Sequence, residues 1–315
     1  MSTQISFMKY RKLAVMFSVI LLIISVGSLV KQGLNFGLDF TGGTLLELEY
    51  PNPVDTNEVR GRLEDAGIQN AVVQHFGKTT EIAIRIPPQE GDGQTDAKES
   101  LGAAGKQILA ALEEGYEADQ IELKRNEFVG PSFGEELRDD GGIALIVALG
   151  FMLLYIAVRF HYRFGFGAVA ALFHDVIIVL GFFSLMQFSF DQSVLAAILA
   201  VIGYSLNDTI VVADRVRENF HDNLESDDTE GLIDLSLNQT LSRTIFTSLT
   251  TVLVLLALYF FGGESLRLFA VALLAGIFIG TYSSIYVASS LLVSLGVTPS
   301  DFKEPEVDEL EDEMP

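Results

Sequence analysis

The sequence predicts a membrane α-helical bundle of six transmembrane helices with a small α+β, ferredoxin-like domain outside the membrane. Two observations lead to this prediction. The chain of 315 residues contains six long apolar segments, and its 42 acidic and 20 basic side chains lie almost entirely between them. Since a helix needs about 20 apolar residues to cross a bilayer, a chain that is 49% hydrophobic with a net charge of −22 must separate the two characters along its length.

The first apolar segment, 13–30, follows three basic residues and so resembles a signal peptide. No small-residue cleavage site precedes Lys31, and the apolar run is longer than in a usual signal peptide, so we predict an uncleaved helix. The last segment is long enough to tilt or to extend into the interface. The five further predicted spans are 141–158, 164–185, 194–212, 243–261 and 266–295.

Basic side chains beside the predicted spans set the orientation. With the N-terminus in the cytoplasm, the short outer loops contain a single basic residue, Arg267, whereas the opposite orientation breaks the positive-inside rule. We therefore expect a multi-pass membrane protein with cytoplasmic N- and C-termini, whose external domain is periplasmic if the host is Gram-negative. The basic residues that this orientation places inside are Lys9, Arg11, Lys12, Arg159, Arg163, Arg215, Arg217 and Arg243.

The charge also predicts the domain organisation. The predicted external domain has a net charge of −12, a central cytoplasmic loop at 213–242 has −6, and the tail has −7. The excess acidic residues therefore lie in the parts outside the membrane, where they mostly serve to keep the surface hydrated. The predicted segments are the N-terminus with the first helix (1–30), the periplasmic domain (31–140), the five remaining helices (141–298) and the acidic cytoplasmic tail (299–315).

The predicted periplasmic domain has the pattern β-α-β-β-α-β, which is typical of split-βαβ, ferredoxin-like folds. One helix is expected from the cap Asp55 to Ala66 and a second over 100–112, with a linker at the glycine-rich stretch 91–95. Such a fold is a binding platform that supplies no chemistry by itself. The predicted strands are 44–50, 71–76, 81–86 and 121–128.

Composition excludes several functions. A pI of about 4.4 leaves no clustered Lys and Arg for phosphates, so we expect no nucleic-acid partner. The absence of cysteine excludes disulfides, Cys-ligated zinc and a thiol nucleophile. The four histidines lack metal-binding spacing, there is no P-loop, and the string at 203–205 does not complete a hydrolase nucleophile motif. We therefore expect no metal, no cofactor and no enzymatic activity.

The sharpest functional signal is an acidic residue inside a predicted span. Asp208 lies about 20 Å from the outer end of its helix, at 1.5 Å per residue. An unpaired charge at that depth costs several kcal/mol, so its side chain must face the bundle interior and be either partnered or protonated. The favoured interpretation is a place on an ion or proton pathway, and the alternative is a structural hydrogen bond between helices.

Arg243 begins the fifth span from the cytoplasmic side, at a depth that matches Asp208. Thr244 and further hydroxyls recur behind it at helical spacing, and Asn207 precedes the aspartate in the chain. A carboxylate beside an arginine and a line of hydroxyls can act as a proton relay. The alternative is a lipid-facing arginine that reaches to the interface, and position alone does not separate the two.

Asp175 is a lesser member of the predicted proton pathway. It follows His174 near the middle of the third span, so the two can form a second relay element. A hydrogen bond between neighbouring helices is the favoured interpretation.

Small residues recur at every fourth position of the last span. This spacing lets another helix approach closely, and we predict a packing face whose partner is either internal or a second subunit. The residues are Ala272, Gly276, Gly280, Ser284 and Ala288.

Several strings, in order along nearly the whole chain, resemble the SecD/SecF family of translocase subunits. The stretch just after the first span is similar to the family signature, through Gly37, Asp39, Phe40, Gly42 and Gly43. The short external domain and single six-span unit favour the SecF type over the SecD type. The other matching strings are 129–134, 173–175, 203–210, 214–219, 239–244 and 283–288.

The resemblance implies a role in protein export. SecF proteins pair with a six-span SecD and the small YajC, assist the SecYEG channel and act on preprotein substrates, and their membrane part is similar to that of RND transporters. Proton flow is expected to drive movement of the external domain, with the family's membrane Asp and Arg matching Asp208 and Arg243. The alternatives are an RND-type exporter of small molecules or lipids, for which the external domain is small, and a non-conducting scaffold subunit.

Overall fold

The structure is a computed structural model that describes residues 5–68, 70–76, 78–87, 108–109, 112, 120–160 and 162–302. It divides into two compact units. The membrane unit contains Met1–Leu34, Val147–Phe188 and Ala196–Pro315, and the sheet unit contains Asn35–Ile146 and Ser189–Leu195. The predicted linker at 91–95, most of the predicted helix 100–112 and the acidic tail beyond 302 lie outside the described residues.

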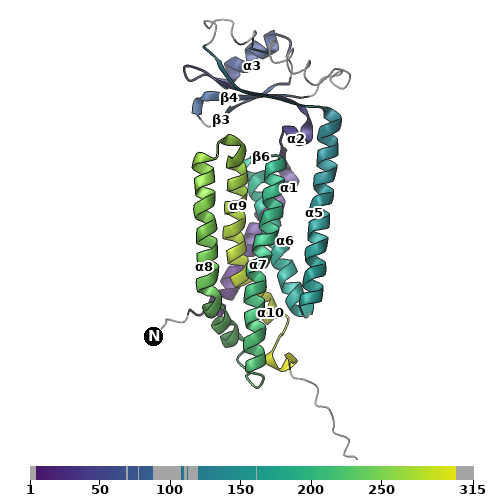
Figure 1. The fold of residues 1–315 in the computed structure, drawn as a ribbon, viewed down its shortest axis with the longest axis vertical. Coiled ribbons are helices and arrows are strands. Elements are labelled where there is room, and N and C mark those ends of the chain that lie inside the picture. Colours follow the sequence, from purple (N-terminus) through teal and green to yellow (C-terminus); the bar gives the residue numbers. More distant parts are fainter. Residues whose placement is uncertain are drawn as a thin grey trace, which may run out of the picture. The chain divides into compact units, whose positions relative to one another are not determined.

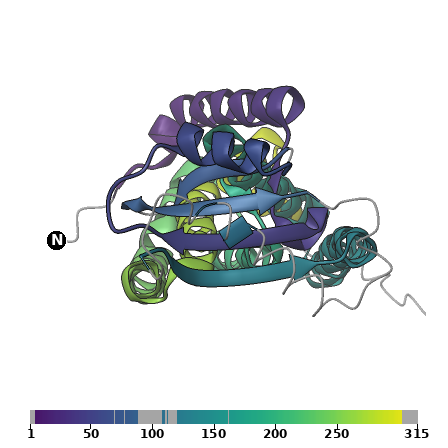
Figure 2. The same cartoon turned by 90° about the horizontal axis from the view of Figure 1, so that it is seen from above.

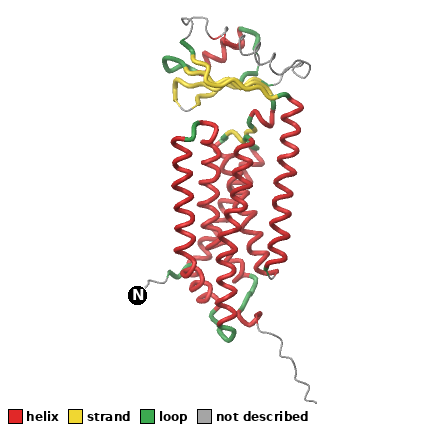
Figure 3. The backbone as a smooth tube through the Cα atoms, viewed as in Figure 1, coloured by secondary structure: helices red, strands yellow, loops and turns green. Residues whose placement is uncertain are grey.

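Six helices of the described chain are long and apolar enough to cross a membrane, which confirms the predicted fold class (Figures 1 and 3). The last span is interrupted by a π-helical turn, Ser284–Ala288, between α9 and α10. The helices are α1 (Arg11–Gln32, after a 3-10 turn at Met8–Tyr10), α5 (Pro131–Arg159), α6 (Tyr162–Met186), α7 (Gln192–Asp222), α8 (Thr229–Phe261), α9 (Glu264–Ser283) and α10 (Ser289–Ser294).

Most of the predicted loop 213–242 is helical, because α7 continues to Asp222 and α8 begins at Thr229. The α8 start is capped by Asp228, whose side chain accepts a hydrogen bond from the backbone of Gly231. Apolar side chains at helical spacing in both extensions are buried in one cluster despite the surrounding acid. Span prediction from apolar length misses such amphipathic ends, since only one face of the helix is apolar.

Helix α6 is the most enclosed of the six spans. Its Gly181 lies against Ser25 of α1 so closely that a Cβ atom there would overlap the serine. Helices α1, α6 and α9 also line a mostly apolar pocket of about 260 Å³. Because such surroundings offer no hydrogen-bond partners, polar groups on these helices must find partners within the bundle.

The sheet unit contains a four-stranded antiparallel sheet in the order β3-β4-β2-β5, the arrangement of a split-βαβ fold. Figure 2 shows these strands side by side. Asp55 caps the helix by accepting from the backbone N–H of Asn57 at 2.9 Å, as the sequence predicts. Three apolar residues of the predicted second helix are described. Ile108 and Leu112 are buried in the core with residues of the strands, and Leu109 is partly buried against the same core. The elements are β2 (Gly43–Glu49), α3 (Thr56–Asp65), β3 (Val72–Phe76), β4 (Lys78–Ile86) and β5 (Glu122–Val129).

Three further short elements of the sheet unit were not predicted. Strands β1 (Asn35–Phe36) and β6 (Ser189–Phe190) form a two-stranded parallel pair, and a one-turn helix, α2 (Leu38–Thr41), follows β1. Two-residue strands carry no readable periodicity, so the pairing depends on contacts between residues far apart in the sequence.

Candidate functional site

Among the described residues of the membrane unit, two aspartates are buried on helices long and apolar enough to cross a membrane, where an unpaired carboxylate is costly. Asp175 on α6 has an exposed fraction of 0% and Asp208 on α7 of 7%. Burial of a carboxylate away from water requires hydrogen-bond donors or a countercharge. The partners that each aspartate finds therefore define what the site can do.

Asp208 accepts hydrogen bonds from two helices. The Thr244 hydroxyl of α8 donates to Oδ1 at 2.7 Å, and the Ser284 hydroxyl, at the start of the π-helical turn, donates to Oδ2. Two hydroxyl donors suit an ionised carboxylate, which accepts only. Arrival of a proton on Asp208 would turn an acceptor into a donor and force one of these hydroxyls to reorient.

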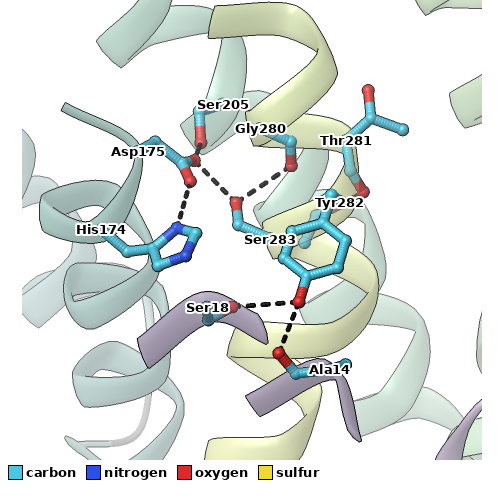
Figure 4. Close-up of polar contacts among 10 residues, drawn as sticks. Ala14, Ser18, His174, Asp175, Ser205, Gly280, Thr281, Tyr282 and Ser283 are labelled. Carbon is cyan, nitrogen blue, oxygen red and sulfur yellow. Dashed lines mark hydrogen bonds and ion pairs between the residues drawn. The ribbon is translucent and has the colours of Figure 1, made fainter. Parts of the chain in front are cut away.

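Asp175 accepts from α7 and α9 and lies beside an imidazole (Figure 4). The Ser283 hydroxyl donates to its Oδ2 at 2.6 Å, and the Ser205 hydroxyl donates to the same oxygen. His174 Nδ1 lies 2.8 Å from Oδ1, whereas its Nε2 is buried and has no hydrogen-bond partner among the described residues. The pair combines a buried acceptor that has three neighbours with a titratable ring that has one free nitrogen.

The imidazole also faces a tyrosine that anchors the first helix (Figure 4). The rings of His174 and Tyr282 have centroids 6.3 Å apart, and the Tyr282 hydroxyl donates to the carbonyl of Ala14 at 2.7 Å. The same hydroxyl lies 3.0 Å from Ser18 Oγ. The polar contacts around Asp175 therefore reach α1 as well as α6, α7 and α9.

We refer to the two aspartates and their hydrogen-bond partners as the carboxylate network, because their serine partners are consecutive residues of the last span. Ser283 contacts Asp175 and the next residue, Ser284, contacts Asp208. On α7, Ser205 lies three residues before Asp208 and so on the same face of the helix. The π-helical turn begins at Ser284, and such turns occur frequently at functional sites in α-helices. The network joins α6, α7, α8 and the last span.

A second set of hydroxyls lies one helical turn from this network. The Tyr204 hydroxyl of α7 donates to Ser248 Oγ of α8 at 3.1 Å, and Ser248 lies 2.9 Å from Thr281 Oγ1 of α9. These three helices therefore share two successive polar layers, and the predicted line of hydroxyls on α8 faces the bundle at Thr244 and Ser248.

Arg243 and Asn207 do not join the network. Both side chains are exposed, and within the described part of the chain no ion pair links Arg243 to Asp208. The reason is helix geometry, since successive residues point about 100° apart. With Thr244 turned toward Asp208, its neighbour Arg243 points in a different direction, although its charge still acts on the Asp208 carboxylate. Asn207 diverges from Asp208 in the same manner.

The small-residue face of the last span packs against α7 of the same chain. A Cβ atom on Gly276 would overlap Val201, and one on Gly280 would lie 3.2 Å from the Cβ atom of Ser205. Ala272 is fully buried. These small residues allow the close approach that brings Ser284 to Asp208.

Sequence reasoning missed Ser205 and Ser283 as partners of a carboxylate, and it treated Ser284 as a packing residue. The signal that could have found them is a hydroxyl at helical spacing from a buried acid, combined with two adjacent serines in an otherwise apolar span. Among the residues that the structure describes, no group of three or more His, Asp or Glu side chains is placed to hold a metal ion.

The signature residues belong to the sheet unit, and the carboxylate network belongs to the membrane unit. Gly42 and Gly43 have φ angles of +69° and +111°, which favour glycine, and a Cβ atom on Gly43 would overlap the carbonyl of Ile86. Phe40 stacks on Phe190 with centroids 5.9 Å apart. The signature thus shapes a tight turn between α2 and the sheet.

Comparisons with known proteins support one family. The family model described as protein export membrane protein SecD/SecF, C-terminal, matches residues 108–298, and the SecD/SecF GG motif matches residues 27–54. The chain is 47% identical over 311 residues to a protein translocase subunit SecF of Pseudomonas aeruginosa, covering 99% of this chain and 98% of that one. A SecF of Vibrio alginolyticus is 44% identical over 315 residues, covering 99% and 97%.

A solved structure is similar over most of the chain. The crystal structure of SecDF, a translocon-associated membrane protein from Thermus thermophilus, matches with a TM-score of 0.80 and 39% identity. The match covers 94% of this chain but 39% of that longer chain. The solved structure, the relatives, the fold and the signature agree. This chain is a multi-pass membrane protein of the SecD/SecF family, of the SecF type.

Proposed function

We propose that the chain acts in a bacterial Sec export machinery by coupling proton flow across the inner membrane to a movement of its external domain that assists preprotein translocation. The observation that carries this proposal is the pair of buried carboxylates, Asp208 and Asp175, whose hydroxyl partners Ser284 and Ser283 are consecutive residues of the last span. We propose a transport role and no enzymatic one.

The network has the chemistry that proton transfer needs. Each hydroxyl can donate one hydrogen bond and accept others, so Thr244, Ser284 and Ser283 can pass a proton on while they reorient. One charge that crosses 100 mV releases about 2.3 kcal/mol, and a hydrogen bond to a charged group contributes about 1.5–3 kcal/mol. One proton per cycle therefore suffices to break and remake about one such bond, which is the scale of change available at Asp208.

Arg243 has a place in this proposal despite its exposure. It matches the family's membrane arginine, and its long flexible side chain starts one residue from the Thr244 that contacts Asp208. We propose that the guanidinium approaches Asp208 in the part of the cycle in which the carboxylate is ionised. Exchange of a hydroxyl partner for a guanidinium partner would then mark the two states of the site.

Orientation and partners complete the proposal. Within the described part of the chain, four of the eight basic residues that the positive-inside rule places in the cytoplasm form ion pairs near the ends of the spans, among them Arg11 with Glu230 at 3.0 Å and Arg159 with Asp214 at 2.9 Å. We propose that both termini are cytoplasmic and that the chain works with SecD, YajC and the SecYEG channel on preprotein substrates.

The test replaces Asp208 by asparagine in the full chain and measures preprotein export in cells with and without a protonophore. Asp208→Asn should abolish the gradient-dependent part of export while the protein still inserts and purifies with SecD. Asp222→Asn is the matched control, since it makes the same change at an exposed position of the same helix. Full gradient-dependent export in Asp208→Asn would instead favour a scaffold subunit.

A further inference from the structure

Four residues of the sheet unit gather around the start of α7, and the proposed proton pathway uses none of them. Gly37 and Asp39 belong to the family signature, Arg85 lies on β4, and Asp191 immediately precedes α7. We refer to these four residues as the α7 cap cluster. Helix α7 is also the helix that carries Asp208.

Two carboxylates cap the first turn of α7. Asp191 Oδ1 accepts from the backbone N–H of Val194 at 2.9 Å, as an ordinary N-cap does. Asp39, 153 residues away in the sequence, accepts from the backbone N–H of Gln192 at 3.0 Å. The free N–H groups of a helix start are usually satisfied by the local chain or by water. Here one of them is satisfied by the signature segment.

The residues just before α7 are tied to the same segment. Strand β6 pairs in parallel with β1, and the N–H of Gly37 donates to the carbonyl of Phe190 at 2.7 Å. A Cβ atom on Gly37 would lie 3.0 Å from the Cβ atom of Asp191, so this approach leaves little space for any larger residue. Backbone pairing thus holds the residues just before α7, and the Asp39 cap holds its first turn.

Arg85 connects this assembly to the main sheet. From β4 its guanidinium donates to the carbonyl of Phe36 at 3.1 Å and to Ser189 Oγ at 2.8 Å, one on each strand of the β1–β6 pair. Burial lowers the pKa of the Arg85 guanidinium, while the charges of Asp191 and Asp39 oppose that shift. The Arg85 guanidinium therefore lies within electrostatic reach of both carboxylates that cap α7.

We propose that the α7 cap cluster is a rigid joint that fastens the first turn of α7 to the sheet, so that displacement of the helix carrying Asp208 is passed to the sheet. This inference rests on the proposed proton-coupled function. Along α7, Asp208 lies about 24 Å from Gln192 at 1.5 Å per residue, and a continuous helix transmits displacement over that length only if its end is held. Asp39 is then a positioning residue.

The first arm of the test separates a geometric cap from a proton carrier. Asparagine keeps the acceptor oxygen that caps Gln192, whereas alanine removes it. We expect Asp39→Ala to lower gradient-dependent export about ten-fold and Asp39→Asn to stay within about two-fold of the unchanged chain. Insertion and purification with SecD are followed in both variants. Equal loss in both variants would contradict a capping role.

The second arm restores the joint covalently. The chain has no cysteine, so the pair Gly37→Cys and Asp191→Cys can form no other disulfide within the chain. A disulfide needs Cβ atoms about 3.5–4.5 Å apart, which the 3.0 Å at these positions reaches with a small adjustment. Added to Asp39→Ala, the oxidised pair should restore export to within about two-fold of the same pair with Asp39 present, and a thiol reductant should remove the gain.

A matched control places the cross-link elsewhere in the sheet. Gln74 and Ala83 are cross-strand partners of β3 and β4, so Gln74→Cys with Ala83→Cys gives a disulfide that leaves α7 untouched. Oxidation of this pair should not restore export to Asp39→Ala. Equal rescue by both pairs would show that general stabilisation of the sheet suffices, and the joint would be refuted.

Three further results would overturn the inference. Failure of the Gly37→Cys and Asp191→Cys pair to oxidise would contradict the geometry itself, and arrest of export by that disulfide with Asp39 present would mean that the joint must open. If the oxidised pair does not restore export to Asp39→Ala, the cluster does not act as a tether between α7 and the sheet. The proposed function fails separately, if Asp208→Asn keeps gradient-dependent export. Loss in Asp208→Asn with normal export in Asp39→Ala refutes the joint alone.

Discussion

The hydrogen bond from Thr244 to Asp208 is a direct probe of the charge on the buried carboxylate. Thr244 has an exposed fraction of 2%, and its hydroxyl lies 2.7 Å from Oδ1. Thr244→Val keeps the shape of the side chain and removes only the donor. Hydrogen bonds between neutral groups in membrane proteins average about 0.6 kcal/mol, whereas those to charged groups contribute about 1.5–3 kcal/mol. The size of the loss therefore reports whether Asp208 is ionised.

The assay is thermal unfolding of the purified chain in detergent, over a range of pH. We expect Thr244→Val to lower the free energy of unfolding by about 1.5–3 kcal/mol wherever Asp208 is ionised, and by about 0.6 kcal/mol in an Asp208→Asn background, where the partner is neutral. Thr250→Val is the matched control, because Thr250 lies exposed on the same helix and donates only to backbone carbonyls. A cost equal to that of Thr250→Val at every pH would refute the assignment of Thr244 as a partner of a charged Asp208.

Two further predictions concern the packing of α9 and the surface of the sheet. Gly276→Ala introduces a Cβ atom that overlaps Val201, so it should lower the free energy of unfolding by about 1–3 kcal/mol. The control Gly203→Ala introduces a Cβ atom that meets nothing within 4 Å, so it should lower the free energy of unfolding by less. Equal losses for the two variants in thermal unfolding would contradict the α7–α9 contact. The hydrogen bond from Lys124, 2.8 Å away, lowers the pKa of Glu49, so this pair stabilises the sheet above the ordinary pKa of a glutamate and loses its effect as the pH falls. Lys124→Gln should therefore reduce amide protection at Glu49 near neutral pH but not in acid, as measured by hydrogen exchange, and unchanged protection at neutral pH would count against it.

The sequence predicts those features that depend on local pattern. Six apolar runs of sufficient length predict six spans, and alternation of apolar residues predicts the four strands, because both signals lie within a few turns of the chain itself. The capping role of Asp55 follows equally from its local sequence. Element boundaries were less accurate where a helix is amphipathic beyond the membrane, as at the end of α7.

Contacts between helices are the part that the sequence could not predict. Depth in the membrane suggests that Asp208 and Arg243 are neighbours, but depth does not fix the rotation of a helix about its axis. The rotation of α8 turns Thr244 toward Asp208 and Arg243 outward. The contact between Ser284 and Asp208 depends on close packing of α9 on α7 and on a π-helical turn, and neither has a local sequence signal strong enough to place it.

The central claim is that protons cross the membrane by way of Asp208. The most direct measurement is the rate of lumenal pH change, followed with a pH-sensitive dye, in vesicles that contain the chain purified together with its SecD partner and carry an imposed proton gradient. The account predicts that Asp208→Asn abolishes the proton flux that depends on the complex, while Asp222→Asn, on the same helix, conducts like the unchanged chain. Undiminished flux through Asp208→Asn would contradict the account.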